Sequence, residues 1–230
     1  MHKVTNQTPH GLTKRNDRRS VVFAKSCSGH SLLEMLIVLA LIGVVTSMAL
    51  PQLIAERRLS RSVGITREIQ TQLRLARQLA MSQRQAFTFQ YDNTTKQISI
   101  IDHNSNPGGP ILLDPSYPNT AGSKVVSTMP LAEAGISSEI TYGIPSGLPS
   151  GAYGALGDGI PMTPLSNFQL NITFQPDGSA IDVSGDPKGC AMFIYNSKAA
   201  AGTASAISVL GASGRVKIWR FNAGANRYAD

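Results

Sequence analysis

The chain has 230 residues, of which 42% are hydrophobic, 15% charged and 6% aromatic. This composition excludes a disordered chain and suits one globular domain with one further element. The net charge of +7 is unevenly spread: residues 1–29 and 56–84 each carry +5, residues 85–230 carry −2, and Glu34 supplies the remaining −1. The basic charge therefore lies in a tail and one helix, which argues against a protein that coats DNA.

Cysteine and histidine are sparse. Cys27 and Cys190 are the two cysteines, and the chain has four histidines, so no disulfide framework exists. A zinc site or a histidine-based catalytic group would need more partners than this. Asp177, Asp182 and Asp186 form the one local carboxylate cluster, around a turn and without a histidine. We therefore weigh a periplasmic enzyme only as a minor hypothesis and expect no catalytic residue, metal or cofactor.

An apolar segment near the N-terminus is the strongest feature. The 21 residues from Met35 to Ala55 contain no charge. A helix of this length spans roughly 31 Å, close to the ~30 Å hydrocarbon core of a bilayer. The pattern predicts a membrane-spanning helix.

Two interpretations of this segment compete. Ser47-Met48-Ala49 would serve as the cleavage site of an ordinary secretory signal. Against that, the basic tail is long, the apolar run is overlong, and Glu34 stands at its beginning. Flanking charge does not decide the orientation, because residues 10–33 and 56–75 each hold five Lys or Arg.

The junction Gly29-His-Ser-Leu-Leu-Glu34 before the apolar run resembles the class III leader of type IV pilins and pseudopilins. The resemblance implies cleavage after Gly29 by a prepilin peptidase, N-methylation of His30 by the same enzyme, and retention of the helix as an inner-membrane anchor. His30 departs from the usual phenylalanine. Glu34 takes the place of the glutamate that the family uses in assembly, where it would pair with the new N-terminus of a neighbouring subunit.

The cost of placing a carboxylate in a bilayer agrees with a role for Glu34 in assembly. A carboxylate entering a bilayer costs on the order of 2–3 kcal/mol or more unless it finds a partner. The alternative is a carboxylate that rests in the headgroup region.

Pro51 lacks a backbone donor, so we expect a kink or local melting near residues 47–51, and Gly43 also falls where many pilins loosen the helix.

Helical periodicity continues to about residue 84. Apolar residues recur at three- to four-residue steps, at Leu59, Val63, Ile69, Leu73, Ala76 and Ala80. Seven arginines occupy the other positions and are most simply a solvated face, although lipid phosphates or acidic filament neighbours are alternatives. One long helix should lie half in the membrane and half on a domain.

Beyond residue 85 the period changes to two, which predicts an antiparallel β domain. The expected strands are 86–91, 97–102, 124–127, 138–142, 168–175, 179–183, 190–195, 206–210 and 215–221. Pro176-Asp177-Gly178 is the clearest hairpin turn. Residues 104–123 and 142–166 are loops by composition, and Gly154-Ala-Leu-Gly157-Asp-Gly159 is interpreted as a flexible loop rather than a phosphate site. Cys190 and Trp219 are expected to pack.

The fold class is therefore α+β, with a long N-terminal helix packed on a C-terminal antiparallel β domain. The expected organisation is a leader (1–29), a transmembrane and filament-core helix (30–55), an amphipathic helix (56–84) and a periplasmic domain (85–230). The C-terminal pattern from Phe174 to Lys217 resembles the GspH/FimT branch, which implies a minor subunit.

The first functional hypothesis is a minor pseudopilin of a type II secretion pseudopilus, a single-pass inner-membrane protein. Its implied partners are the prepilin peptidase and N-methyltransferase, other pseudopilins or pilins, the inner-membrane assembly platform and membrane lipid. The second is a FimT-like minor type IV pilin acting in pilus assembly or DNA uptake. It rests on Gly214-Arg215-Val216-Lys217 with Arg220, which would support weak, salt-sensitive DNA binding. The simpler interpretation of Gly214-Arg215 is a hairpin turn.

Overall fold

The structure is a computed structural model that describes residues 31–103, 123–132, 137–146, 148, 156–182 and 185–230. The chain divides into two compact units, with the boundary between Thr46 and Ser47. Helix α1 (Leu32–Gln83) contributes to both. We call residues 47–230 the β-domain unit.

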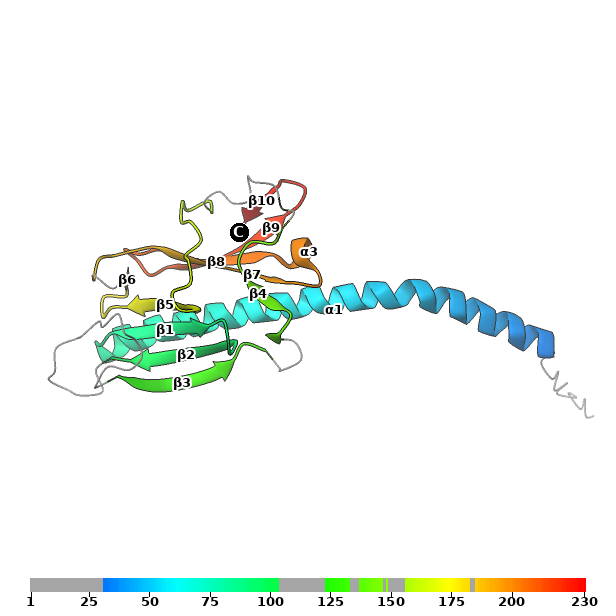
Figure 1. Cartoon of the computed structure of the whole chain (residues 1–230), viewed down its shortest axis with the longest axis horizontal. Coiled ribbons are helices and arrows are strands. Elements are labelled where there is room, and N and C mark those ends of the chain that lie inside the picture. The colour runs from blue at the N-terminus through cyan, green and yellow to red at the C-terminus, as the bar shows by residue number, and fades with distance from the viewer. Residues whose placement is uncertain (1–30, 104–122, 133–136, 147, 149–155, 183–184) are drawn as a thin grey trace, which may run out of the picture. The chain divides into compact units, whose positions relative to one another are not determined.

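Two antiparallel five-stranded sheets make up the β-domain unit (Figure 1). The first has the order β3-β2-β1-β5-β6, and its strands are β1 (Phe87–Asp92), β2 (Gln97–Asp102), β3 (Lys124–Pro130), β5 (Gln169–Phe174) and β6 (Ala180–Ile181). The second has the order β10-β9-β8-β7-β4, and its strands are β4 (Ile140–Tyr142), β7 (Cys190–Asn196), β8 (Ser205–Val209), β9 (Val216–Asn222) and β10 (Arg227–Ala229). A short helix, α3 (Ala200–Thr203), joins β7 to β8. The predicted α+β class is confirmed.

One face of α1 packs against both sheets in the main core (Figure 1). Ile69, Leu73, Ala76 and Ala80 are fully buried there, as the periodicity predicts. Leu59 was expected on the same face but is 45% exposed. The first turns of this face use polar residues instead, which hydrophobic periodicity does not detect.

Those polar residues are Ser62 and Thr66, both buried. The Ser62 hydroxyl donates to the Thr203 carbonyl (3.1 Å), and the Thr66 hydroxyl donates to the Ser62 carbonyl (2.9 Å). Thr66 Oγ1 also lies 2.9 Å from Ser205 Oγ. These bonds satisfy buried polar groups and join α1 to the start of β8.

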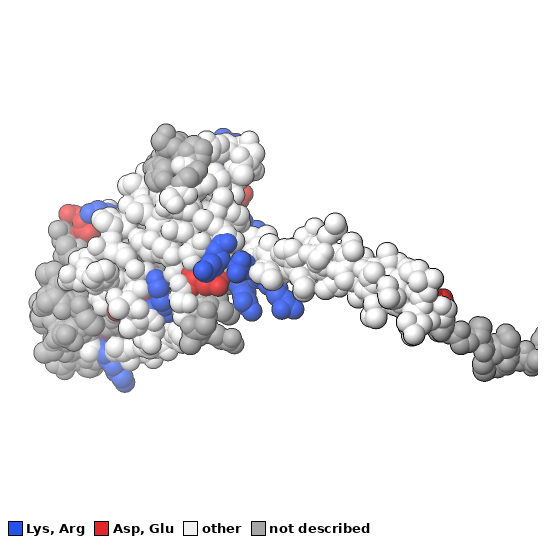
Figure 2. Space-filling model, turned by 45° about the vertical axis from the view of Figure 1, so that its right-hand side comes forward, with Lys and Arg blue, Asp and Glu red and all other residues white. Residues whose placement is uncertain are grey.

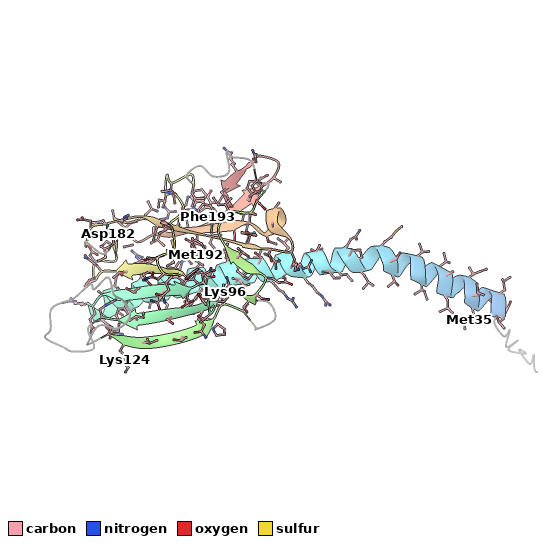
Figure 3. The ribbon with its side chains drawn as sticks, viewed as in Figure 1. Met35, Lys96, Lys124, Asp182, Met192 and Phe193 are labelled. Carbon is pink, nitrogen blue, oxygen red and sulfur yellow. The ribbon has the colours of Figure 1, made fainter. Side chains whose placement is uncertain are left out.

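A second core lies on the other face of the second sheet. Met192 and Phe193 are neighbours on β7, and they point to opposite faces of the sheet (Figure 3). Met192 joins the main core, whereas Phe193 packs with Trp219 and Tyr228 in the second. Trp219 is buried and Cys190 is partly buried against the main core, so both agree with the predicted packing roles.

The segment around Asp158 is part of this second core. Trp219 Nε1 donates to Ser208 Oγ (2.8 Å), and Ser208 Oγ donates to Asp158 Oδ2 (2.5 Å). A Cβ added at Gly157 would lie 2.9 Å from the Trp219 ring. Residues 156–160 are therefore held against the second sheet, in contrast to the flexible loop expected at 154–159, of which residues 154 and 155 lie outside the described residues.

Candidate functional site

The N-terminal half of α1 exposes its apolar side chains. Leu36, Leu39, Leu41 and Val45 are each more than half exposed. Helix α1 is long and apolar enough to cross a membrane. No part of its most apolar 18-residue stretch is buried against the rest of the described chain. Since such a surface is unfavourable in water, this half of the helix requires either lipid or other helices around it.

The start of α1 combines a helix cap with Glu34. Ser31 Oγ accepts a hydrogen bond from the backbone N–H of Leu33 (3.2 Å), as an N-cap residue does. Glu34 is exposed in the first helical turn, where its charge is favourable to the helix dipole. The capping role of Ser31 was not predicted. Gly29 and His30 lie outside the described residues.

Helix α1 continues through Gly43 and Pro51. We expected a kink or local melting at residues 47–51. The helix is continuous through Pro51, so the backbone does not melt there, because a helix can pass through a proline at the loss of one backbone hydrogen bond. A kink at Gly43 or Pro51 stays a prediction. The boundary between the two compact units falls between these two residues, at Thr46 and Ser47.

The three C-terminal basic residues expected to contact DNA do not share one face. Lys217 lies on the face of β9 that carries Trp219, whereas Arg220 lies on the opposite face with Val216 and Ile218. The Lys217 ammonium is 2.8 Å from Asp230 Oδ2 and 4.3 Å from the centroid of the Trp219 ring. The hydrogen bond and charge of Lys217 lower the pKa of Asp230. Arg215 is exposed beside them.

Gly214 has a structural role in this hairpin. Its φ is +58°, and an added Cβ would lie 2.0 Å from the carbonyl oxygen of Gly178. Arg77 of α1 donates from Nε to the same carbonyl (3.1 Å). Gly214 is thus explained by the closure of the fold without any ligand.

The carboxylates near Asp177 serve the local turns. The Asp177 carboxylate accepts from both the N–H (2.8 Å) and the hydroxyl (2.6 Å) of Ser179, and the hydroxyl bond is the main cause of its lowered pKa. Asp182 lies 3.7 Å from the Lys188 ammonium. Among the described residues, no group of three or more His, Cys, Asp or Glu is placed to hold a metal ion. Burial raises the pKa of the Cys190 thiol to about 12, as for an unreactive strand residue.

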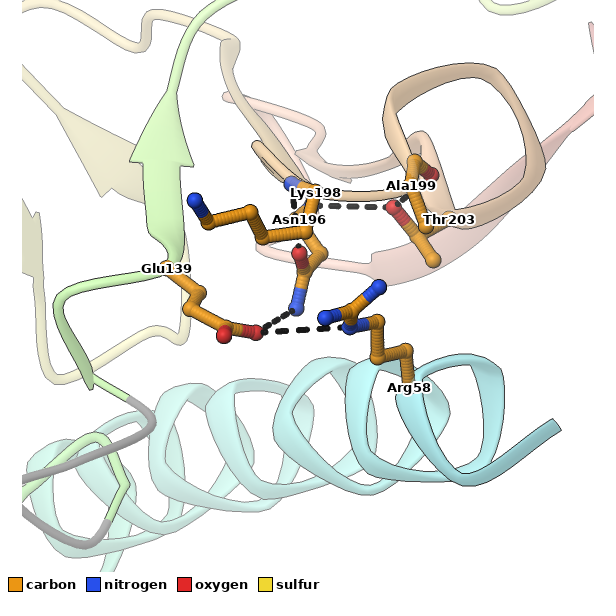
Figure 4. Close-up of polar contacts among 6 residues, drawn as sticks. All are labelled: Arg58, Glu139, Asn196, Lys198, Ala199 and Thr203. Atoms are coloured by element: carbon orange, nitrogen blue, oxygen red, sulfur yellow. Dashed lines mark hydrogen bonds and ion pairs between the residues drawn. The ribbon is translucent and has the colours of Figure 1, made fainter. Parts of the chain in front are cut away.

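Two of the α1 arginines bind the helix to the β strands. Arg77 holds the Gly178 carbonyl, and Arg58 Nε lies 3.9 Å from Glu139 Oε2 (Figure 4). The same Glu139 oxygen accepts from Asn196 Nδ2 (2.9 Å). Five others, Arg57, Arg61, Arg67, Arg74 and Arg84, are exposed, consistent with the expected solvated face.

Comparison with known proteins supports the N-terminal assignment. Residues 24–50 match the family described as the prokaryotic N-terminal methylation motif. This match confirms the predicted resemblance of the N-terminal segment to type IV pilin and pseudopilin signals. The match includes Gly29, His30 and Glu34 together with most of the apolar run.

The solved structures give two similar chains, both crystal forms of the type IV minor pilin FimU of Pseudomonas aeruginosa PAO1. The form in space group P21 has a TM-score of 0.40 and 16% identity, and the match covers 71% of this chain and 89% of that one. The P65 form has a TM-score of 0.38 and 16% identity, and covers 67% and 90%. No curated protein matches the chain.

Proposed function

We propose that this chain is a minor pseudopilin, a structural subunit of the inner-membrane-anchored pseudopilus of a type II secretion system. The observation that carries the proposal is the methylation motif placed directly on a helix whose second half is built into the β-domain unit. Such a helix can be anchored and later packed among other helices while carrying a folded domain with it.

The proposed maturation uses three positions. The prepilin peptidase cuts after Gly29 and methylates His30, and residues 30–55 remain as the single-pass anchor. Residues 85–230 then lie in the periplasm. Glu34, exposed in the first turn, pairs with the N-terminal amine of a neighbouring subunit, because a carboxylate at this depth needs a cationic partner.

A Glu34→Gln substitution tests the assembly step. We expect the variant to be processed and to remain in the membrane, yet to lose cross-linking to the other subunits through the N-terminal helix. Glu56→Gln, at the other end of the apolar run, is the matched control and should cross-link normally. Normal assembly of Glu34→Gln would contradict the role of this carboxylate.

Deletion of the chain distinguishes a role in a secretion machine from a role in a pilus. We expect the deletion to leave folded secretion substrates in the periplasm and to leave surface pili and DNA uptake unchanged. Loss of pili or of transformation with intact secretion would instead favour the minor type IV pilin. The arrangement of Lys217 and Arg220 on opposite faces of β9 supports the secretion proposal over DNA uptake.

A further inference from the structure

Exposed basic side chains gather where α1 emerges from the β strands (Figure 2). Arg57, Arg61 and Lys198 are exposed, and none of the three is ion-paired with an acidic group of the described chain. We call these three residues the basic collar. Arg58 is excluded because it is engaged with Glu139.

A chain of contacts links the backbone of Lys198 to Arg58 of α1. Arg58 lies against Glu139, Glu139 accepts from Asn196, and the Asn196 side-chain oxygen accepts from the backbone N–H of Lys198 (2.8 Å). Figure 4 shows this sequence of contacts from α1 to the loop before α3. The loop after β7 therefore cannot move away from α1 without breaking a polar network.

The nearest acidic side chain on α1 lies apart from the collar. Glu56 lines a groove of about 730 Å³ between α1 and α3, together with Leu59 and Thr203. On a helix with 100° per residue, Arg57 and Arg61 lie about 100° or more from the Glu56 direction. The three positive charges of the collar thus exceed the single negative charge of Glu56.

Helix geometry sets the depth of the collar, on the basis of the proposed membrane anchor. If residues 35–55 fill the hydrocarbon core, Arg57 and Arg61 follow within about 9 Å of its edge. The headgroup layer on each side is about 5 to 8 Å thick, so Arg57 falls within this layer and Arg61 at its outer edge. Basic residues beyond the exported end of a helix oppose the usual charge bias.

We propose that the basic collar binds anionic phospholipid headgroups and seats the base of the β-domain unit on the membrane surface before assembly. Arginine offers a planar set of donors that matches a phosphate, and each basic residue at an anionic surface contributes about fivefold in affinity. The network through Glu139 and Asn196 holds Lys198 on this surface together with the arginines. Release of these contacts accompanies extraction of the subunit from the bilayer.

Lipid counting on the full chain tests the proposal. The chain is purified in a nonionic detergent and mixed with phosphatidylglycerol or with phosphatidylcholine of the same acyl chains. Native mass spectrometry then counts the lipids that remain bound. The test variant is R57Q/R61Q/K198Q, and the matched control R67Q/R74Q/R84Q removes the same charge from exposed sites farther along α1.

We expect the wild type and the control to prefer phosphatidylglycerol, and the collar variant to lose roughly 100-fold in that preference. Equal preference in all three proteins, or equal loss in both variants, would overturn the proposal. A collar variant that keeps its lipid preference but fails to cross-link to other subunits would also overturn it, and would assign the collar to acidic neighbours.

Failure of the proposed function gives a different result from failure of the lipid-binding proposal. Cleavage after Gly29 is read from the N-terminus of the same purified proteins, and it does not depend on the collar. Thermal unfolding followed by circular dichroism shows that each variant is folded. Normal cleavage with no lipid preference would reject the collar alone, whereas absent cleavage would reject the pilin-type maturation.

Discussion

The α-carbon of Gly214 lies so close to the Gly178 carbonyl that any side chain at position 214 would collide with backbone. A Cβ there would be 2.0 Å from that oxygen, and the φ of +58° is itself unfavourable for other residues. This contact ties the turn before β9 to the turn between β5 and β6, and thus joins the two sheets at one end.

Gly214→Ala should be strongly destabilising. The backbone clash and the positive φ together should lower the free energy of unfolding of residues 47–230 by roughly 2–4 kcal/mol, measured by urea unfolding. Gly202→Ala is the control, because an added Cβ at Gly202 meets nothing within 4 Å. A similar small change in both variants would contradict the packing described here.

Arg77→Met should weaken the attachment of α1 to the same turn. Its Nε donates to the Gly178 carbonyl at 3.1 Å from a half-buried position. Loss of this charge-assisted bond should cost about 1–2 kcal/mol in unfolding free energy. The exposed Arg74→Met should stay within about 0.5 kcal/mol of the wild type. Equal effects at the two positions would show that the bond contributes nothing.

The buried hydroxyl pair between α1 and β8 should show coupling. Thr66→Val leaves the Ser205 hydroxyl without this partner and should cost about 1–2 kcal/mol. Adding Ser205→Ala should recover part of that loss, since both polar partners are then removed. A double-mutant cycle by urea unfolding measures the coupling, and strictly additive effects would contradict it.

Acid should destabilise the β-domain unit between about pH 6.5 and pH 4 through His103. Burial lowers the pKa of His103 to about 4, and its Nε2 lies 2.9 Å from Thr88 Oγ1. The unfolded chain binds a proton near pH 6.5 whereas the folded chain resists it, so this contribution is complete above pH 6.5 and is lost as the pH falls.

The expected loss across this range is roughly 1–3 kcal/mol, measured by urea unfolding at several pH values. His103→Gln should flatten the dependence, although the variant can be less stable overall. An unchanged pH dependence in this variant would assign the effect to other groups.

Sequence reasoning succeeded where structure is local. The strand at residues 97–102 has the predicted bounds, and the turn at Gly178 follows from its Asp-Gly dipeptide. The apolar helix was predictable because its length and composition can be read directly from one contiguous segment. Strand β10 and helix α3 were missed, since each is short and formed by pairing or packing with distant residues.

In the candidate site, too, contiguous features were predicted and features formed by distant residues were not. The Gly29 to Glu34 motif is contiguous and was found directly. The separation of Lys217 from Arg220 already follows from side-chain alternation along the predicted strand at 215–221, and the two cores show which face of β9 each residue occupies. Ser62 and Thr66 were missed because their partners, Thr203 and Ser205, lie 141 and 139 residues away along the chain.

The N-terminal residue of the mature chain distinguishes a retained pilin-type helix from a cleaved secretory signal. Mass spectrometry of the protein isolated from membranes should show a chain that begins at His30 and carries an N-terminal methyl group. Replacing Gly29 with a bulky residue should leave an uncut precursor. A mature chain that begins after Ala49 and lacks the apolar run would contradict the account and identify an ordinary secretory signal.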